Sequence, residues 1–437
     1  MDILSSSNGV NPRSAVITGI GITSPYGVGK AAFFKGLRAG KPAVSNVTIV
    51  ESEGLKSRVV GEIKDLDPLT WFEKAEAARV PRIVPLAVSA AKEAFEDAGI
   101  PVATMTDDEK REVNVLVGTG AGGIDFAERQ YTLYFKGEGR RVTPYAISSS
   151  FVGMLSSEIS IYFGLRGSTH VISTGCTSST DAMGYAYRAI KHGDADLILT
   201  GGAEACITHG IMAGFDRMQV TSTKFNDTPE RSSRPFNIDR DGFVLGEGAW
   251  MYVMESYERA VKRNAKIYGF VRGYGSTCDA YHRVLMTPDG LEPARAMKMA
   301  LNDARIDPDK VDYVNLHGTS TQMNDEVETR AMKRVFEKAA YGIPMSATKS
   351  LIGHPQGACG AAGIAASLLA LNTGVIHPTA NYENPDPKCD LDYVPNHAIQ
   401  KDTSWILANC LAFGSKNSSL VLARADRNGH GALLGES

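Results

Sequence analysis

Residues 171–179, VISTGCTSS, decide the fold of this chain, because they join a predicted strand to a predicted helix. The apolar residues at the start are typical of a buried strand, and residues 179–192, rich in Ala, Met, Tyr and Ile, are typical of a packed helix. The apolar run LILT at 197–200 predicts a second strand, so the unit is βαβ. Cys176 therefore lies at a strand-to-helix turn, where the free amides and the dipole of the helix start favour a thiolate. Most buried cysteines are structural, so the assignment of a nucleophile depends on the rest of the chain.

Composition excludes several classes of protein. The 437 residues are 43% hydrophobic and carry a net charge of −3, which allows a large core in two or three domains and does not point to a nucleic acid partner. No apolar run is long enough for a transmembrane helix, and the N-terminus has no secretory signal pattern, so no membrane association is expected. The six cysteines are scattered without a CxxC pair, which predicts neither a metal site nor disulfides and favours the reducing cytoplasm.

The chain contains an internal repeat. AFEDAGI at 94–100 and ALNDARI at 300–306 each end an amphipathic helix. Each is followed by a strand and a loop with Gly and Thr, at 113–120 and 311–319, and the Cys176 turn matches MSATKS at 345–350. Three matches in the same order predict a duplication. The alternation of strands and helices predicts largely parallel sheets covered by helices, with the corresponding loops of both halves around one site.

The repeat sets the expected domain organisation. We expect an N-terminal half over residues 13–256, which carries the cysteine, and a C-terminal half over residues 257–425. The polar ends, residues 1–12 and 426–437, are expected to be flexible tails.

Three further segments carry polar chemistry. His317 lies in NLHGTST at 315–321, at the end of a predicted strand, where α/β sheets place ligands. His354 lies in KSLIGHPQGACG at 349–360, before a helix of small residues, and the third segment is NCLAFGSKN at 409–417. A lone histidine is usually a hydrogen-bonded core residue. Two histidines beside glycines, together with an activated cysteine, instead indicate a catalytic site.

A known family carries these motifs. The sequence contains GCTSS at 175–179, GGAE at 201–204, RPF at 234–236, DRDGFVLGEG at 239–248, HGTST at 317–321 and KSLIGH at 349–354. Together, and in this order over roughly residues 13–425, they resemble the condensing enzymes of the thiolase superfamily, specifically β-ketoacyl-acyl carrier protein synthases of the second type. The resemblance implies an α/β, thiolase-like fold, in which two duplicated α/β halves form a layered αβαβα core.

The resemblance also implies roles for individual residues. Cys176 would take the acyl chain from an acyl carrier protein as a thioester, and malonyl carrier protein would then lose carbon dioxide. His317 and His354 would donate hydrogen bonds to the resulting enolate, and the backbone amides of Cys176 and Phe413 would hold the tetrahedral oxyanion. Phe413 would also act as a gate.

Other roles concern the surroundings of this centre. Lys349 would pair with Glu328, either as a structural salt bridge or to set the charge around the histidines, and Thr319 and Thr321 would contact the pantetheine arm. No cofactor is implied, because the substrates are carried on the phosphopantetheine arm of the acyl carrier protein. A dimer is implied, either a homodimer or a heterodimer with a subunit like a chain-length factor.

The chain departs from the family at two places. Where the family has GFGGTN, residues 412–417 read AFGSKN, and the loss of two flexible glycines predicts a stiffer or differently timed gate at Phe413. We hypothesise that Lys416 contacts the malonate carboxylate or a phosphate of the arm; the alternative is an exposed loop lysine. Ala121 replaces a residue that is often a bulky aliphatic lining the acyl tunnel, which predicts an open tunnel that accepts long or rigid chains.

Basic residues mark a candidate docking surface for the acidic carrier protein. They lie in two segments that align with the docking face of the family: Lys74, Arg79, Arg82, Arg140 and Arg141. If they form this surface, association with the carrier weakens steeply with salt.

The leading prediction is a ketosynthase for fatty acid or polyketide chain extension. A variant of it is the active subunit of a heterodimer with a chain-length-factor partner. A non-catalytic partner subunit is disfavoured because Cys176, His317 and His354 are all present. A degradative thiolase is disfavoured by His317 and because Cys410 lacks the Cys-Gly-Gly setting of the second catalytic cysteine in those enzymes.

Overall fold

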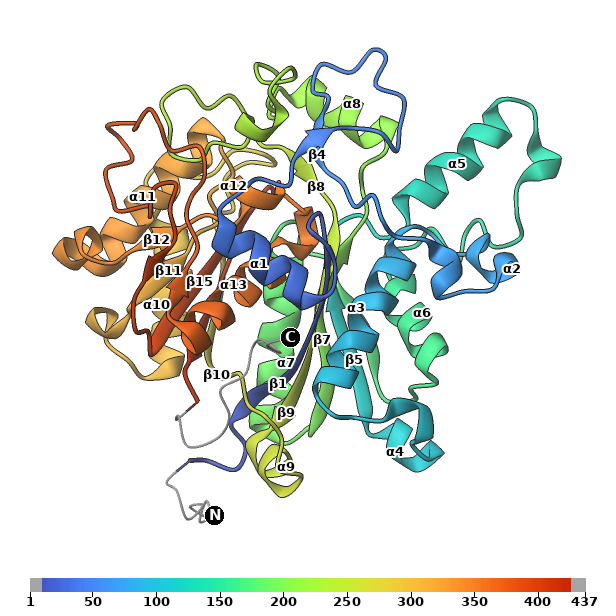
Figure 1. Cartoon of the computed structure of the whole chain (residues 1–437), viewed down its shortest axis with the longest axis horizontal. Helices are drawn as coiled ribbons and strands as arrows, with labels where there is room; N and C mark the ends of the chain where they lie inside the picture. The colour runs from blue at the N-terminus through green and yellow to red at the C-terminus, as the bar shows by residue number, and fades with distance from the viewer. Residues whose placement is uncertain (1–9, 426–437) are drawn as a thin grey trace.

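The computed structural model describes residues 10–425 (Figure 1). Within these residues, eleven strands form one sheet in the order β12-β11-β15-β16-β10-β1-β9-β7-β5-β6, with β2 paired to β1. The strands of the N-terminal half are β1 (Ala15–Ser24), β2 (Gly27–Val28), β5 (Val113–Gly118), β6 (Thr169–Ile172), β7 (Leu197–Glu204) and β9 (Gly248–Ser256). The strands of the C-terminal half are β10 (Gly269–Cys278), β11 (Tyr313–Asn315), β12 (Met345–Ser346), β15 (Trp405–Ala412) and β16 (Lys416–Ala423).

The order of the strands confirms the predicted duplication. Read outward from the centre of the sheet, β1-β9-β7-β5-β6 in one half corresponds to β10-β16-β15-β11-β12 in the other. The two halves meet where β1 pairs with β10, at Ala15 opposite Val271. The repeats found in the sequence fall on equivalent elements, because 113–120 contains β5 and 311–319 contains β11.

The prediction of a largely parallel sheet is wrong for the centre of the molecule. Within the large sheet of residues 10–425, the parallel pairs are confined to β5, β6 and β7 in one half and β11, β12 and β15 in the other. The central strands β1, β9, β10 and β16 pair antiparallel. One reason is local: β15 and β16 are joined by the short turn at residues 413–415, and a connection that short permits only antiparallel pairing.

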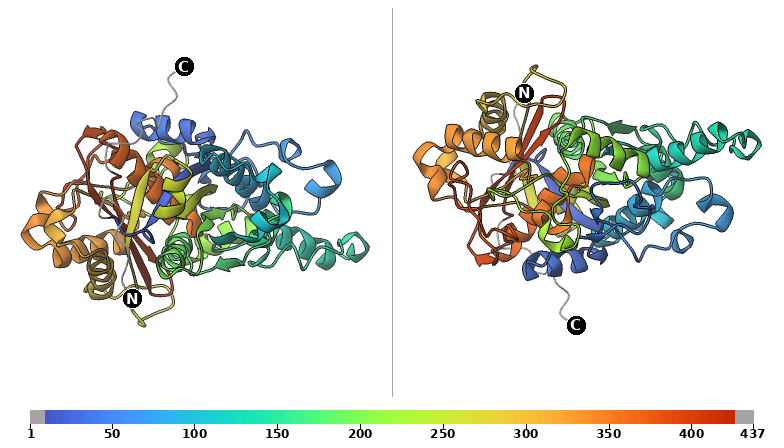
Figure 2. Two further views of the ribbon diagram at one scale, coloured as in Figure 1. Left: turned by 90° about the horizontal axis from the view of Figure 1, so that it is seen from below. Right: turned by 90° about the horizontal axis from the view of Figure 1, so that it is seen from above.

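Helices cover the sheet in the expected layers. Between the halves lie α7 (Ser178–His192) and α13 (Cys359–Thr373), as Figures 1 and 2 show. The outer layers contain α3 (Ile83–Asp97) and α6 (Met154–Phe163) on the N-terminal half, and α10 (Leu291–Ala304) and α11 (Gln322–Phe336) on the C-terminal half. Helix α13 is buried on all sides, which explains its composition of small and aliphatic residues. The thiolase-like αβαβα arrangement is therefore confirmed.

Paired strand glycines hold both outer helices close to the sheet. A Cβ at Gly21 of β1 would lie 1.8 Å from the carbonyl oxygen of Ala90 in α3. A Cβ at Gly275 of β10 would lie 2.1 Å from the carbonyl oxygen of Ala296 in α10. Any side chain would therefore push the helix away, and Gly19 of β1 and Gly273 of β10 make the same kind of contact with these helices.

The remaining elements lie around this core. The helices are α1 (Lys30–Ala39), α2 (Lys74–Ala77), α4 (Asp107–Arg111), α5 (Ile124–Phe135), α8 (His209–Met218), α9 (Tyr257–Lys262) and α12 (Lys349–Ile352). The small strands are β3 (Ser45–Asn46), β4 (Val59–Gly61) and β8 (Leu245–Gly246) in one sheet, and β13 (Val375–Ile376) and β14 (Ile399–Gln400) in another. None of the helices in the described part of the chain has the length and apolar character needed to cross a membrane. Of the predicted tails, residues 1–9 and 426–437 lie outside the described residues.

An arm projects from the N-terminal half. It consists of α5 and the segment that follows it to residue 151, and it stands away from the body of the molecule in Figures 1 and 2. Its tip exposes Tyr134 and Phe135, the latter at 81% of its surface. Strand β6, at the edge of the sheet, is also exposed along its first residues.

Candidate active site

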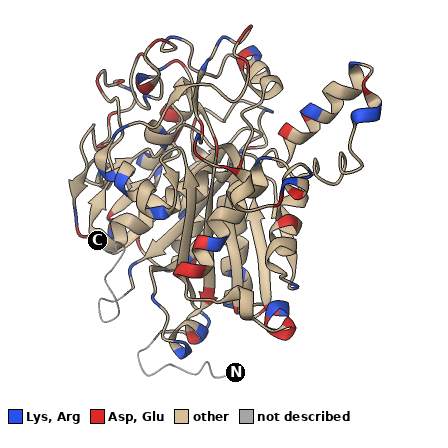
Figure 3. Cartoon of the chain, turned by 45° about the vertical axis from the view of Figure 1, so that its right-hand side comes forward, with Lys and Arg blue, Asp and Glu red and all other residues tan. Residues whose placement is uncertain are grey.

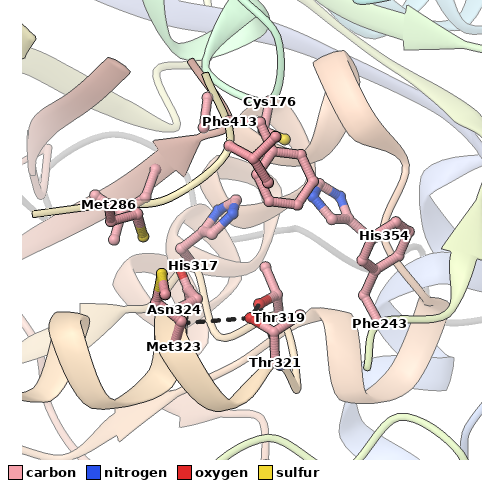
Figure 4. A pocket seen from close by; sticks show the side chains of 13 residues that line it. Cys176, Phe243, Met286, His317, Thr319, Thr321, Met323, Asn324, His354 and Phe413 are labelled. Atoms are coloured by element: carbon pink, nitrogen blue, oxygen red, sulfur yellow. Dashed lines mark hydrogen bonds between the residues drawn. The ribbon is translucent and has the colours of Figure 1, made fainter. Parts of the chain in front are cut away.

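Cys176 lies where the sequence predicts it, between β6 and α7. Gly175 adopts a φ of 70°, which allows the sharp turn before the cysteine, and Thr177 immediately precedes the first residue of α7. The Cys176 side chain is only 5% exposed and lines a narrow cavity (Figure 4).

Both predicted histidines line the same cavity. His317 follows β11, and His354 follows α12 after Gly353, whose φ is 72°. The Cys176 sulfur and one ring nitrogen of each histidine lie within 4.8 Å of one another, and the two rings are nearly perpendicular with centroids 5.3 Å apart. Figure 4 shows all three side chains directed toward one space. The structure therefore brings together the cysteine of one half and the histidines of the other.

The thiol of Cys176 is harder to ionise than its position suggests. Burial raises the pKa of the Cys176 thiol, and the neighbouring Cys359 raises it further. Lys349 and the backbone N–H of Phe413, which donates to the sulfur, act in the opposite direction. The expected effect of the helix start is thus outweighed by the burial of the thiol.

The histidines are neutral hydrogen-bonding groups. Burial, with a contribution from Lys349, lowers the pKa of His317 to about 3, and burial also lowers the pKa of His354. The Lys349 Nζ lies 3.2 Å from His317 Nδ1 and donates to it, which leaves the ring proton of His317 on Nε2. The Nδ1 atom of His354 has no hydrogen-bond partner within residues 10–425.

The predicted pairing of Lys349 with Glu328 is wrong. The Lys349 Nζ bonds to the ring and the carbonyl oxygen of His317. The Glu328 carboxylate accepts instead from the backbone N–H groups of His317 and Gly318, both at 2.8 Å, and from the Asn409 side chain. Burial raises the pKa of Glu328 to about 7, against the effect of these donors. Since the amides occupy its oxygens, Glu328 fixes the loop that carries His317 rather than the lysine.

The cavity itself is narrow and mostly apolar. It measures about 40 Å³ and is lined by Cys176, Phe243, Val284, Met286, His317, Thr319, Thr321, Met323, Asn324, His354, Leu411, Ala412 and Phe413. The predicted contacts Thr319 and Thr321 are among them, with their hydroxyl oxygens 2.9 Å apart. An apolar channel with two hydroxyls at its wall fits a thin, flexible substrate arm.

The turn that carries Phe413 is anchored at Ser415. Ser415 has a φ of 69°, in the left-handed region that glycine adopts most easily. Its hydroxyl donates to the carbonyl oxygen of His282 at 2.9 Å, and its own carbonyl accepts from the Asp279 N–H at 2.8 Å. These contacts restrain the turn beside the gate residue.

Two predicted binding residues do not line the cavity with Cys176. Ala121 is half-buried in an apolar cluster that also contains Phe413 and Phe215. Lys416 is the first residue of β16, opposite Cys278, and is not among the lining residues.

The predicted docking residues fall into different environments. Arg82 is bound to the buried carboxylate of Glu247 at 2.6 Å and to the carbonyl oxygen of Ile63, so its guanidinium has a structural role inside the N-terminal half. Arg79 pairs with Glu76 and Arg141 pairs with Glu138 at the surface. Within the described residues, Lys74 and Arg140 form no ion pair. Figure 3 shows basic and acidic residues mixed along the projecting arm.

Sequence reasoning missed three residues that contact the nucleophile. The thiols of Cys359 and Cys410 both donate to the carbonyl oxygen of Cys176, at 3.2 and 3.1 Å. The Gln356 side-chain oxygen lies 3.8 Å from the Cys176 sulfur. No spacing in the sequence marks these residues, because the contacts form only when α13 and β15 pack behind α7.

Comparisons with known proteins agree with this geometry. The profile of the Beta-ketoacyl synthase, N-terminal domain, matches residues 13–260, and that of the Beta-ketoacyl synthase, C-terminal domain, matches residues 268–383. The 3-oxoacyl-[acyl-carrier-protein] synthase 2 of Coxiella burnetii is 38% identical over 412 residues, which cover 94% of this chain and 99% of that protein. The tetracenomycin polyketide synthase ketoacyl synthase alpha subunit of Streptomyces glaucescens is 40% identical over 419 residues, 94% of this chain and 97% of that protein.

Solved structures give the same result. The ishigamide ketosynthase/chain length factor superposes with a TM-score of 0.87 at 32% identity, over 94% of this chain and 99% of that one. A type II polyketide synthase acyl-carrier protein in complex with its ketosynthase bound to the hexaketide gives a TM-score of 0.86 at 31% identity, over 95% and 100% of the two chains. This chain therefore belongs to the β-ketoacyl synthase family of acyltransferases.

Proposed function

We propose that this protein is a β-ketoacyl-acyl carrier protein synthase, which extends a fatty acid or polyketide chain by two carbons. The observation that carries the proposal is the meeting of the Cys176 sulfur with the ring nitrogens of His317 and His354 within 4.8 Å. They lie in a narrow cavity with the hydroxyls of Thr319 and Thr321 at its wall. This arrangement provides a nucleophile, two neutral hydrogen-bond donors and a channel for the arm of a carrier protein.

In the first half-reaction the acyl group moves to Cys176. The sulfur attacks the thioester carbonyl of acyl carrier protein, the bond to the pantetheine sulfur breaks, and the thiol proton passes to that leaving sulfur. The Phe413 N–H, which reaches the Cys176 sulfur, is placed to hold the oxyanion of the tetrahedral intermediate together with the Cys176 N–H. Burial raises the pKa of the free Cys176 thiol, which favours loss of its proton during the attack rather than before it.

In the second half-reaction malonyl carrier protein loses carbon dioxide. The bond between the carboxylate and the methylene carbon breaks, and its electron pair forms an enolate on the thioester. His317 and His354 donate ring N–H bonds to the enolate oxygen. The enolate carbon then attacks the acyl group, the bond to the Cys176 sulfur breaks, and the thiolate regains a proton from solvent. Lys349 acts as a positioning residue, since its bond to Nδ1 keeps the His317 proton on Nε2.

The proposed steps use side chains and backbone N–H groups of this chain, with both substrates carried on phosphopantetheine. Acyl carrier protein is therefore the expected partner, and the proposed docking residues are the exposed Lys74, Arg140 and Arg141 together with the half-buried Arg79. We also place the protein in the cytoplasm, where Cys359 and Cys410, with sulfurs 3.5 Å apart, remain reduced.

Reversing the charge of Arg140 and Arg141 tests the docking surface. In the double variant Arg140→Glu/Arg141→Glu we expect the KM for acyl carrier protein to rise about tenfold with kcat unchanged, because rim charges govern association. Steady-state kinetics at several salt concentrations give the measurement. The matched control is Arg111→Glu on α4, an exposed arginine outside the arm. An equal rise in KM in both variants would show a general charge effect and contradict docking at the arm.

The side chain at position 121 tests the proposed acyl tunnel. Ala121 packs in the same apolar cluster as Phe413, so a larger side chain there fills space next to the gate. We expect Ala121→Ile to lower kcat/KM for the longest accepted acyl chains about tenfold and to leave acetyl transfer unchanged. Acyl carrier proteins of graded length give the profile, and thermal unfolding of both proteins separates this effect from overpacking. Superimposable profiles would contradict an open tunnel at this position.

A second candidate function is the active subunit of a heterodimer with a chain-length-factor-like partner. The exposed aromatic tip of the arm and the open edge strand β6 favour association through this face, with a second copy of this chain or with such a partner. Light scattering on the chain alone separates the two: a dimer indicates the homodimer, and a monomer without activity indicates a missing partner.

Intact-mass analysis tests the proposed function directly. The protein is mixed with acyl carrier proteins of graded length, and malonyl carrier protein is then added. We expect an acyl adduct on Cys176 that disappears as a β-ketoacyl product two carbons longer is formed. A folded, dimeric protein that forms no adduct at any length would exclude the proposal.

A further inference from the structure

A second cluster of sulfur and nitrogen atoms lies directly behind the nucleophile. It consists of Cys359 at the start of α13, Cys410 in β15 and His317. The two sulfurs are 3.5 Å apart, the Cys410 sulfur is 3.4 Å from His317 Nδ1, and the three ligand atoms all lie within 4.8 Å of one another. None of the three residues is more than 4% exposed. The proposed chemistry uses His317 but neither of these thiols.

These separations match those of a tetrahedral metal site. Zinc binds thiolate sulfur at about 2.3 Å and imidazole nitrogen at about 2.0 Å, so two ligated sulfurs are about 3.8 Å apart and a sulfur and a nitrogen about 3.5 Å. The observed 3.5 and 3.4 Å are within a few tenths of an ångström of these values. Little movement is therefore needed to place both sulfurs and the nitrogen around one ion.

We propose that Cys359, Cys410 and His317 form a binding site for one thiophilic divalent cation such as Zn²⁺, and that the bound ion inhibits the enzyme. On binding, both thiols lose their protons to solvent, and His317 Nδ1 donates its lone pair to the metal. The fourth position is taken by water or by the carbonyl oxygen of Cys176, which already lies 3.2 and 3.1 Å from the two sulfurs. Thiolate and imidazole are the ligands that favour zinc over magnesium or calcium.

Lys349 is the charged group that faces this site. Its Nζ gives up the bond to His317 Nδ1 but keeps the one to the His317 carbonyl oxygen at 2.7 Å. The positive charge of the lysine opposes a cation, and the two thiolates offset it, since they neutralise the divalent ion. The route of entry is the cavity lined by Cys176 and His317.

The inhibitory effect rests on the proposed function. With a metal on Nδ1, the His317 ring is fixed to the two sulfurs and loses its bond from Lys349. It can then no longer adjust its position toward the oxyanion of the condensation reaction. Binding itself does not depend on that reaction, so the two parts of the inference are tested separately.

Metal stoichiometry tests the site. The reduced protein is incubated with ZnCl₂, desalted and analysed by native mass spectrometry, and CoCl₂ is added in parallel to follow the thiolate-to-cobalt charge-transfer absorption. We expect about one ion per chain in the wild type, and affinity at least about 100-fold lower in both Cys359→Ala and Cys410→Ser. The matched control is Cys389→Ser, another buried free cysteine, which keeps the site. Thermal unfolding shows whether each variant is folded. Because Cys359→Ala and Cys410→Ser remove different ligands, the test still works if one of the two fails to fold.

The catalytic residues offer an alternative set of ligands, Cys176, His317 and His354. The Cys176→Ala variant separates the two sets, because the proposed site keeps its ion and its cobalt–thiolate absorption while the alternative loses both. Loss of the metal in Cys176→Ala, its retention in both Cys359→Ala and Cys410→Ser, or its absence from the wild type would each overturn the proposal. In the condensation assay, we expect zinc to inhibit the wild type over the concentration range in which it binds, and Cys359→Ala to remain active and resistant. A wild-type protein without any condensing activity would contradict the proposed function. The metal-to-protein stoichiometry would still test the proposed metal site in that case.

Discussion

The Cys176→Ala variant is expected to form no acyl adduct and to condense at least about 10³-fold more slowly than the wild type, because it lacks the only proposed nucleophile. The Cys176 sulfur lines the substrate cavity and faces both histidines. Intact-mass analysis with acyl carrier protein measures the adduct, and a radiochemical condensation assay measures the rate. The backbone changes little, since Ala occupies less volume in a site that is already open to the cavity.

This variant tests which of two neighbouring thiols, Cys176 or Cys359, is the nucleophile, because their pKa values are shifted in opposite directions. Burial raises the pKa of the Cys176 thiol. Burial also opposes ionisation of Cys359, but the Cys410 thiol and Lys349 outweigh it and lower the pKa of Cys359. On ionisation alone, Cys359 would be the nucleophile. We expect access to the substrate to select Cys176 instead. Cys359 does not line the cavity, and its thiol donates to the Cys176 carbonyl oxygen.

The matched control for this variant is therefore Cys359→Ala. We expect it to keep the acyl adduct and a condensation rate within a few-fold of the wild type. Peptide mapping of the adduct places it on Cys176. An adduct that survives in Cys176→Ala and is lost in Cys359→Ala would reassign the nucleophile.

The parts of the site that follow from short segments could be predicted from the sequence. The apolar residues before Cys176 predict a strand and the segment rich in Ala, Met, Tyr and Ile after it predicts a helix, and β6 and α7 are found there. His317 follows a predicted strand, which the structure confirms as β11. The repeated segments at 94–100 and 300–306 end α3 and α10, so the duplication was visible in seven residues of each half.

The parts that depend on distant side chains could not be predicted. Glu328 is eleven residues after His317 in the sequence, yet its carboxylate accepts hydrogen bonds from the backbone N–H groups of His317 and Gly318. Lys349 therefore bonds to the His317 ring instead of to Glu328. Arg82 was assigned to a surface, but a buried carboxylate at position 247 binds it. Cys359 and Cys410 are far apart along the chain and meet only through packing. The sequence identifies the charged and polar groups, but their contacts depend on how distant segments pack in the fold.

The His317→Ala variant is expected to separate the two half-reactions. We expect decarboxylation of malonyl carrier protein to fall about 10²- to 10³-fold, the loss measured when one oxyanion donor is removed, and acylation of Cys176 to stay within a few-fold of the wild type. His317 is a neutral donor, since burial lowers its pKa to about 3 and Lys349 holds its Nδ1. Single-turnover release of carbon dioxide measures the second half-reaction, and the rate of adduct formation measures the first.

The control for His317→Ala is another buried histidine in the same half. His377 lies next to Ser346 and Thr348 but does not line the cavity, so His377→Asn should leave both half-reactions near the wild-type rate. Lys349→Met should slow decarboxylation in the same way as His317→Ala but to a smaller extent. The imidazole ring is still present in that variant, but it lacks the hydrogen bond that orients it. If His317→Ala slowed acylation as much as decarboxylation, the histidine would be supporting the Cys176 pocket, and the two half-reactions would not be divided between the cysteine and the histidines.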